Sequence, residues 1–253
     1  MKLILAPFGR CATNSVSLAI AQSCQESWIG EPFDPQLHNN KYSVETNGSI
    51  KNSLRLLESE GVTLVKHLYS VMSYEDNKSL VENCSHILFL YRSNFVDQYI
   101  SSFMCEELVL HRKKLNLPPI NKDNPYFFNL TLNHLLGKDE DIRYKEYLSV
   151  KRNSIDIDHL KSKFEESLKV FNECKQIFRS LGKNPVGYSY EDIYWLDIES
   201  VFSDMCLCLD CKVHNNSWRE ILSFKNKMFK EECKALIPNY EEVISLREDL
   251  IIQ

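Results

Sequence analysis

Short apolar runs recur along the chain, and their length and spacing predict the strands of a buried sheet. Four runs are almost continuously apolar and are bounded by turn residues or charges. They cover residues 3–6, 62–67, 86–91 and 185–189. Longer segments separate them, so we expect four strands with an element of another kind between each pair.

The segments between the predicted strands have the length and the ending residues of helices. They cover residues 15–23, 50–60, 94–115 and 160–181, and Gly61 and Gly182 close the second and the fourth. Strands that alternate with helices form a parallel sheet with helices on its faces. The pattern therefore predicts an α/β fold with a central parallel sheet flanked by helices.

No repeat, low-complexity tract or linker interrupts the chain, so we expect a single domain over residues 1–253. Residues 116–157 differ from the rest, because prolines and the aromatic cluster Tyr126-Phe127-Phe128 stand among mixed charges. We expect this segment to be a long excursion with short helices that acts as a lid. One or two further helices are expected from Ser217 on, with Trp218 as a packing anchor.

Composition and charge limit the classes of protein. The 253 residues are 43% hydrophobic and 26% charged, as in soluble globular proteins. No apolar stretch is long enough to span a bilayer and the first residues lack a secretory signal, so we expect a cytoplasmic protein. The formal net charge of −5 disfavours general binding to nucleic acid, although a local basic pocket is compatible with it.

The nine cysteines are scattered without a framework-like spacing, as expected of free thiols in a reducing compartment. Three of them, Cys206, Cys208 and Cys211, stand close together. A structural zinc site normally takes four ligands, and His214 or Cys233 could supply the fourth. The alternative is a partly buried helix end that is rich in cysteine. We favour this alternative and predict no metal site.

The turn after the first predicted strand has the composition of an anion site. Pro7, Gly9 and Arg10 interrupt the apolar run, and residues 13–15 then open a helix with small polar side chains. Backbone N–H groups at a helix start are unpaired and attract phosphate or sulfate. An ordinary helix N-cap would explain the same residues. The full Walker pattern is missing and no lysine lies between Lys2 and Lys41, which argues against an ordinary nucleoside triphosphatase loop.

Ligands of open parallel sheets bind beyond the carboxyl ends of the strands, so the residues at those ends belong together. The first strand leads into PFGRCATNS and the third into RSNFVDQYISS. The second ends on Lys66-His67, and the fourth leads into Tyr190-Glu191-Asp192. Arginine has a planar fork suited to phosphate oxygens, and a simple surface ion pair is the alternative role of Arg92.

These segments resemble the sulfotransferases that use 3′-phosphoadenosine 5′-phosphosulfate, in particular the bacterial branch with trehalose and other carbohydrate sulfotransferases. The loop from Gly9 to Asn14 is similar to the family's phosphosulfate loop, although Cys11 stands where serine is common and Ala12 where glycine is usual. Arg92 and Ser101, nine positions later, match the family's 3′-phosphate element. The segments GEPF and VKH, and the Tyr-Glu-Asp that begins at residue 190, are similar to three further family segments.

The resemblance implies a P-loop-like sulfotransferase fold that takes 3′-phosphoadenosine 5′-phosphosulfate as donor and a small-molecule or carbohydrate hydroxyl as acceptor. The implied donor-binding residues are Gly9, Arg10, Cys11, Ala12, Thr13, Asn14, Ser15, Arg92, Ser101 and Tyr190. Arg10 and Lys66 are candidates for stabilising charge on the leaving phosphate. No metal is expected, because a sulfuryl group carries less negative charge than a phosphoryl group and no cluster of acidic residues is apparent.

Two residues are candidates for the base that takes the acceptor's proton. Glu31 matches the branch in which a glutamate resembles the catalytic base, and we favour it. His67 is the alternative, because the neighbouring Lys66 disfavours its protonated form. Both have a structural alternative as well: Glu31 could cap the turn before Pro32, and His67 could form a hydrogen bond inside the core.

Two other functions stay open at this point. A small-molecule kinase would need a lysine in the first loop and an acidic magnesium ligand at a strand end, and the sequence has neither pattern. A nucleotide-binding protein of the same fold without sulfuryl transfer is the other alternative. The acceptor's identity would depend on residues 116–157 and 31–44, and the sequence does not determine it or the oligomeric state.

Overall fold

The computed structural model describes residues 1–35, 37–114, 152–222 and 234–252. The chain divides into two compact units, of which the first contains residues 1–92 and 167–222 and the second contains residues 93–166 and 223–253. The single domain predicted over residues 1–253 stays a prediction. The lid is predicted over residues 116–157, and residues 116–151 of it lie outside the described residues.

The first unit is built on a five-stranded sheet with the order β2-β3-β1-β4-β5, in which every pair of neighbours is parallel. The strands are β1 (Lys2–Ala6), β2 (Trp28–Gly30), β3 (Leu64–Leu68), β4 (His86–Tyr91) and β5 (Val186–Ser189). In the centre, Leu3 of β1 lies opposite Val65 of β3 and Ile87 of β4. The prediction of an α/β fold with a central parallel sheet flanked by helices is confirmed.

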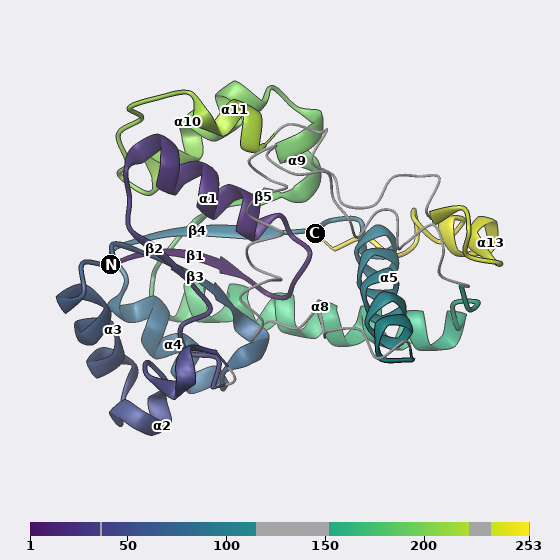
Figure 1. The fold of residues 1–253 in the computed structure, drawn as a ribbon, viewed down its shortest axis with the longest axis horizontal. Helices are drawn as coiled ribbons and strands as arrows, with labels where there is room; N and C mark the ends of the chain where they lie inside the picture. Colours follow the sequence, from purple (N-terminus) through teal and green to yellow (C-terminus); the bar gives the residue numbers. More distant parts are fainter. Residues whose placement is uncertain (36, 115–151, 223–233, 253) are drawn as a thin grey trace. The chain divides into compact units, whose positions relative to one another are not determined.

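The central strands β1 and β4 are almost continuously apolar because helices cover both faces of the sheet. Leu3, Ile4 and Leu5 of β1 are almost completely buried. On one face lie α1 (Thr13–Cys24), α9 (Tyr190–Trp195), α10 (Ile198–Cys208) and α11 (Ser217–Ile221), as Figure 1 shows. On the other lie α3 (Ile50–Ser59), α4 (Tyr74–Asn83) and residues 167–180 of α8 (Ile157–Ser180). A short helix, α2 (Val44–Asn47), precedes α3.

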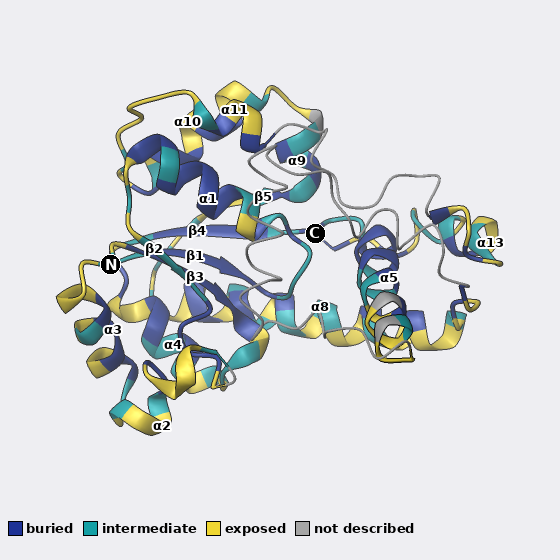
Figure 2. Ribbon diagram, in the orientation of Figure 1, coloured by how far each residue is buried: buried dark blue, intermediate teal, exposed yellow. Residues whose placement is uncertain are grey.

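The helices turn apolar side chains toward the sheet and polar ones outward, as the burial colours of Figure 2 show. On the α1 side, the buried Trp218 ring stacks on Phe202 with the ring centroids 4.8 Å apart. The prediction that Trp218 is a packing anchor is confirmed. On the opposite side, Phe89 of β4 contacts Phe171 and Phe178 of α8 at 5.7 and 5.2 Å. Aromatic rings at such distances bury large apolar areas and fix the helices on the sheet.

The second unit contains α5 (Phe95–Lys114), residues 157–166 of α8 and α13 (Tyr240–Ile244). The end of the chain is tied to the start of α5 through a β-bridge between Asn94 and Ile251. Buried Asp97 accepts hydrogen bonds from Lys234 at 3.4 Å and from Arg247 at 2.8 Å. These contacts order the C-terminal segment within this unit.

The predicted strands and helices agree with the structure to within a few residues, but several elements are additional, among them β2 and α4. Strand β2 has only three residues and ends in Gly30, so it gives no apolar run of strand length. Helix α4 is mostly polar and buries only a few side chains, which hides its helical period. Among the described residues, no helix combines the length and the apolar character that a membrane crossing requires.

Candidate functional site

The carboxyl ends of the five parallel strands meet at one edge of the sheet, and that edge carries most of the predicted site residues. From β1 the chain continues to β2 on one side of the sheet, and β4 is followed by β5 on the other. Adjacent strands whose connections leave in opposite directions define the point where open α/β sheets bind ligands. This point lies between β1 and β4, so the loop after β1 and Arg92 after β4 flank it.

The loop from β1 into α1 has an unusual backbone conformation. Arg10 and Ala12 have positive φ angles of 68° and 59°, in the left-handed region that residues with a Cβ atom rarely adopt. Such conformations persist only where the surrounding structure imposes them, and they cluster at functional sites. At Gly9, by contrast, an added Cβ would meet no atom within 4 Å. The protein's own packing therefore does not require this glycine, which leaves room for a ligand to approach the backbone.

Helix α1 begins without the side-chain cap that other helices of the first unit have. Its N-cap residue is Ala12, which has no polar side chain, and no acidic residue lies in the first turn. In four other helices, a serine at the N-cap accepts a hydrogen bond from the first turn. The start of α1 thus keeps the donors and the partial positive charge that favour an anion.

Positive charges converge on the loop. The Cys11 thiol is fully buried, and its burial raises its pKa to about 12. The positive charges of Arg92, Arg10 and Lys66 act in the opposite direction, and the carboxylate of Glu191 adds to the rise. Cys11 therefore stays a neutral thiol, and its surroundings contain three cations: Arg10 after β1, Lys66 within β3 and Arg92 after β4.

Arg92 is buried against two residues that follow β5. Its guanidinium lies over the Tyr190 ring, 4.2 Å from the centroid, and its Nε is 3.4 Å from Oε1 of Glu191. Only 5% of Arg92 and 9% of Glu191 is exposed, so the ion pair is not a surface contact. This arrangement fixes the plane of the guanidinium, as a phosphate-binding fork requires. Tyr190 supports the arginine.

Tyr194 connects this cluster to α1. Its hydroxyl is hydrogen-bonded to the side chain of Ser15, and burial raises the pKa of the Tyr194 phenol. The rings of Tyr190 and Tyr194 are 4.6 Å apart. Thr13 is buried and Asn14 is exposed at the start of the helix. The structure therefore brings residues 9–15, Arg92 and Tyr190 together in one unit.

Glu31, which follows the end of β2, forms a buried ion pair with Lys66, the third of the five residues of β3. Gly30 of β2 lies opposite Lys66 of β3, which places Glu31 beside the lysine. The Lys66 ammonium contacts the Glu31 carboxylate, and the Glu31 backbone N–H donates to the Lys66 carbonyl at 2.7 Å. Both side chains are more than nine-tenths buried. Glu31 also has a positive φ of 50°, so its backbone is held in a strained conformation.

His67 lies inside the core, as its structural alternative predicts. The side-chain amide of Asn77 donates to the carbonyls of Tyr69, Met72 and Ser73, so its oxygen accepts from His67 Nε2 at 3.1 Å. Nε2 therefore carries the proton, and Nδ1 has no hydrogen-bond partner among the described residues. Burial lowers the pKa of His67 to about 4. The ring is neutral near pH 7 and is completely shielded from solvent.

This burial predicts a pH dependence of stability. The pKa of His67 falls from 6.5 to about 4 on folding, so the unfolded chain binds more protons in this range. The contribution of His67 is complete above pH 6.5 and is lost as the pH falls toward 4. We expect His67→Gln to flatten the loss of unfolding free energy over this window by up to about 1.4 kcal/mol per pH unit. Urea denaturation at several pH values measures it.

His86, which is partly exposed at the start of β4, provides the control for this experiment. His86→Gln should leave the pH profile nearly as in the wild type. A His67→Gln profile parallel to that of the wild type would contradict the assignment of the lost stability to His67.

Ser101 lies in α5 of the second unit, whereas Arg92 belongs to the first, so their joint contact with one phosphate stays a prediction.

The thiols of the CLCLDC segment have separate neighbours. Cys206 contacts Cys24, Cys208 donates to the Ile87 carbonyl, and Cys211 lies near Lys2. Within the described residues no group of histidine, cysteine, aspartate or glutamate side chains is arranged for a metal ion, and Cys233 lies outside them.

Two contributors to this edge have no predicted role: Glu191, which the sequence gives only as part of Tyr190-Glu191-Asp192, and Tyr194. Glu191 directly follows Tyr190 and meets Arg92 because β5 pairs with β4. Tyr194 is one helical turn beyond Tyr190, and this spacing of i and i+4 was the available signal.

Comparison of the chain with protein-family models, curated proteins and solved structures finds no match.

Proposed function

We propose that this protein transfers a sulfuryl group from 3′-phosphoadenosine 5′-phosphosulfate to a hydroxyl of a small-molecule or carbohydrate acceptor. One observation carries the proposal: the uncapped start of α1 follows directly on Cys11, which the cations of Arg10, Lys66 and Arg92 surround. A ligand with several negative charges suits such an edge.

The donor has two anionic parts, a 3′-phosphate and a 5′-phosphosulfate. In the proposal, the phosphosulfate lies against residues 9–15, whose backbone N–H groups and helix dipole favour negative charge. Arg92 then takes the 3′-phosphate. Glu191 and Tyr190 orient the guanidinium that makes this contact.

In the proposed reaction, the acceptor oxygen attacks the sulfur in line with the departing phosphate oxygen. The bond from sulfur to the 5′-phosphate oxygen breaks, and 3′-phosphoadenosine 5′-phosphate leaves with the electron pair. Lys66 and Arg10 stabilise the charge that develops on this phosphate. Glu31 accepts the acceptor's proton. Its ion pair with Lys66 supports this role, because a neighbouring ammonium favours the ionised carboxylate.

His67 is the weaker candidate for the base. None of His67 is exposed, compared with 6% of Glu31, and its Nε2 donates to Asn77 inside the core. Glu31 directly follows a strand end and lies beside Lys66, which the proposal places near the leaving phosphate.

Incubation with donor labelled in its sulfuryl group and a panel of hydroxyl acceptors tests the proposal. We expect acceptor-dependent formation of 3′-phosphoadenosine 5′-phosphate and an equal amount of label in the acceptor. Donor binding without turnover across sugars, phenols and alcohols would favour the alternative of a binding protein without sulfuryl transfer. Transfer of the γ-phosphate from ATP with magnesium would favour a small-molecule kinase.

Arg92→Ala should weaken the binding of 3′-phosphoadenosine 5′-phosphate by about 2 kcal/mol, the usual magnitude of a charge-assisted contact. Binding of adenosine 5′-phosphosulfate, which lacks the 3′-phosphate, should barely change. Isothermal titration calorimetry measures both affinities.

Arg219→Ala is the matched control, since Arg219 also pairs with a glutamate and lies over an aromatic ring but is more than half exposed. It should leave both affinities unchanged. An equal loss for both ligands in Arg92→Ala would contradict the assignment of Arg92 to the 3′-phosphate.

A further inference from the structure

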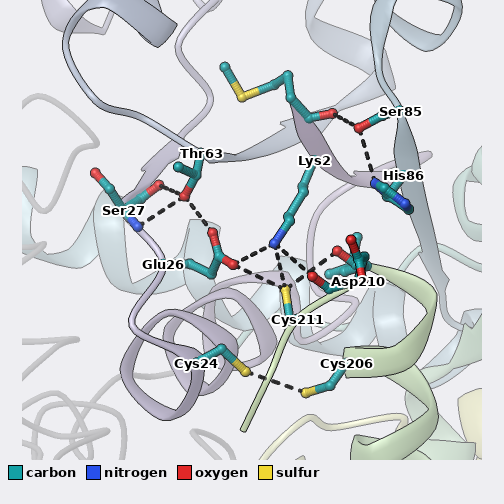
Figure 3. A network of polar contacts seen from close by, with 12 residues as sticks. Lys2, Cys24, Glu26, Ser27, Thr63, Ser85, His86, Cys206, Asp210 and Cys211 are labelled. Carbon is teal, nitrogen blue, oxygen red and sulfur yellow. Dashed lines mark hydrogen bonds and ion pairs between the residues drawn. The ribbon is translucent and has the colours of Figure 1, made fainter. Parts of the chain in front are cut away.

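Two cysteines from distant parts of the sequence face each other at the amino edge of the sheet. Cys24 is the last residue of α1, and Cys206 lies near the end of α10. Their Sγ atoms are 3.7 Å apart, and Figure 3 shows the two side chains pointing toward each other. Rotation of the side chains would have to close only the remaining gap to a sulfur–sulfur bond.

A third thiol and a polar network adjoin this pair. Cys211 is near enough to Cys24 to raise its own pKa, and its Sγ lies 3.3 Å from the Lys2 ammonium and 3.5 Å from Oε1 of Glu26. Cys211 is half-buried, whereas Cys24 and Cys206 are 6% and 2% exposed. The pair is thus covered, with a more accessible polar cluster beside it (Figure 3).

The two thiols lie in direct contact, and either sulfur can donate to the other. Hydrogen bonding to Cys206 is the largest cause of the rise in the pKa of Cys24 to about 12, and hydrogen bonding to Cys211 acts in the opposite direction. The thiolate is the nucleophile in thiol oxidation, and a second thiol in contact with the oxidised sulfur can then form the disulfide.

We propose that Cys24 and Cys206 form a thiol modification site, which a hydroperoxide converts into an intramolecular disulfide. With hydrogen peroxide, the thiolate of one cysteine attacks a peroxide oxygen, which gives a sulfenic acid and releases hydroxide that is protonated to water. The thiol of the other cysteine then attacks the sulfenic sulfur, loses its proton and displaces a second water. Two thiols are oxidised by two electrons, and one hydroperoxide is reduced.

Packing alone would explain a buried cysteine, because the thiol behaves as a small apolar group. Cys84 and Cys174 are examples, since they are equally buried and no sulfur contact to either is found among the described residues. The face-to-face placement of two sulfurs, 182 positions apart in the sequence, distinguishes Cys24 and Cys206. A bond between them would join α1 to α10 and close a long loop of the unfolded chain, which stabilises the folded state. This inference does not depend on the proposed function.

The test uses the reduced full-length protein, treated in its folded state with an equimolar amount of hydrogen peroxide. The reaction is stopped with acid, and the remaining thiols are then alkylated. The mass of the intact monomer is measured. We expect two fewer alkylated cysteines, reversal by dithiothreitol and a midpoint of thermal unfolding that rises by several degrees. Tryptic peptides here contain further cysteines, so fragmentation of the linked peptides must assign the bond to Cys24 and Cys206.

Cys206→Ala should keep all its remaining thiols under the same treatment, and the matched Cys174→Ala should still form the bond. The wild-type peptide map decides the question if Cys206→Ala does not fold. A bond from Cys24 to Cys211, a bond between two chains, oxidation to sulfinic acid or no loss of thiols would each overturn the proposal.

Discussion

Glu31→Gln should lower the turnover of sulfuryl transfer by a factor of about 10² to 10⁴, the usual contribution of a positioned general base. Affinity for 3′-phosphoadenosine 5′-phosphate should stay nearly unchanged, because glutamine still offers an oxygen to the Lys66 ammonium. Steady-state kinetics with labelled donor, together with calorimetric titration of the product nucleotide, separates the two effects.

Glu26→Gln is the matched control for this prediction. Glu26 is also paired with a strand lysine, Lys2, but at the amino edge of the sheet. We expect this variant to keep wild-type turnover. If Glu31→Gln is nearly as active as the wild type while His67→Ala binds donor without turnover, then His67 is the base and the preference for Glu31 is wrong.

Lys66→Met should lower the free energy of unfolding by about 3–5 kcal/mol, because it leaves the Glu31 carboxylate buried without its charge partner. The ion pair is nearly inaccessible, with 4% and 8% of the two side chains exposed. Adding Glu31→Gln to Lys66→Met removes the buried charge and should recover much of the loss. Equilibrium denaturation in urea measures the free energy of unfolding of the wild type, of Lys66→Met and of the double variant.

Lys163→Met tests whether the loss depends on burial. Lys163 pairs with Glu166 on the surface, where both side chains are largely exposed. Such pairs typically contribute less than about 1 kcal/mol, so a small change is expected. A loss of less than 1 kcal/mol in Lys66→Met would contradict a closely packed, buried ion pair.

Much of the fold follows from local sequence. The runs that form β1 and β4 are apolar throughout because both faces are covered, and Gly61 and Gly182 mark helix ends with positive φ angles of 78° and 61°. Strand β2 is not evident, because its three residues are held by pairing with β3 and not by an apolar pattern of their own.

The candidate site is predictable in its members and less so in their contacts. Parallel strands bring their carboxyl ends to one edge, which is enough to group Arg10, Lys66 and Arg92. The partners of these cations depend on which strands are neighbours. Glu31 meets Lys66 through the pairing of β2 with β3, and Glu191 meets Arg92 through the pairing of β4 with β5. Sequence spacing alone does not contain this order.

The most direct test of the central claim compares the effects of two nucleotides on the thermal unfolding of the wild-type protein. Binding to the folded state alone stabilises a protein by about 2.7 kcal/mol when the ligand exceeds its Kd 100-fold. The account predicts that 3′-phosphoadenosine 5′-phosphate raises the unfolding midpoint by several degrees, and that ATP with magnesium leaves it unchanged. No shift with 3′-phosphoadenosine 5′-phosphate at millimolar concentration, or an equal shift with ATP and magnesium, would contradict it.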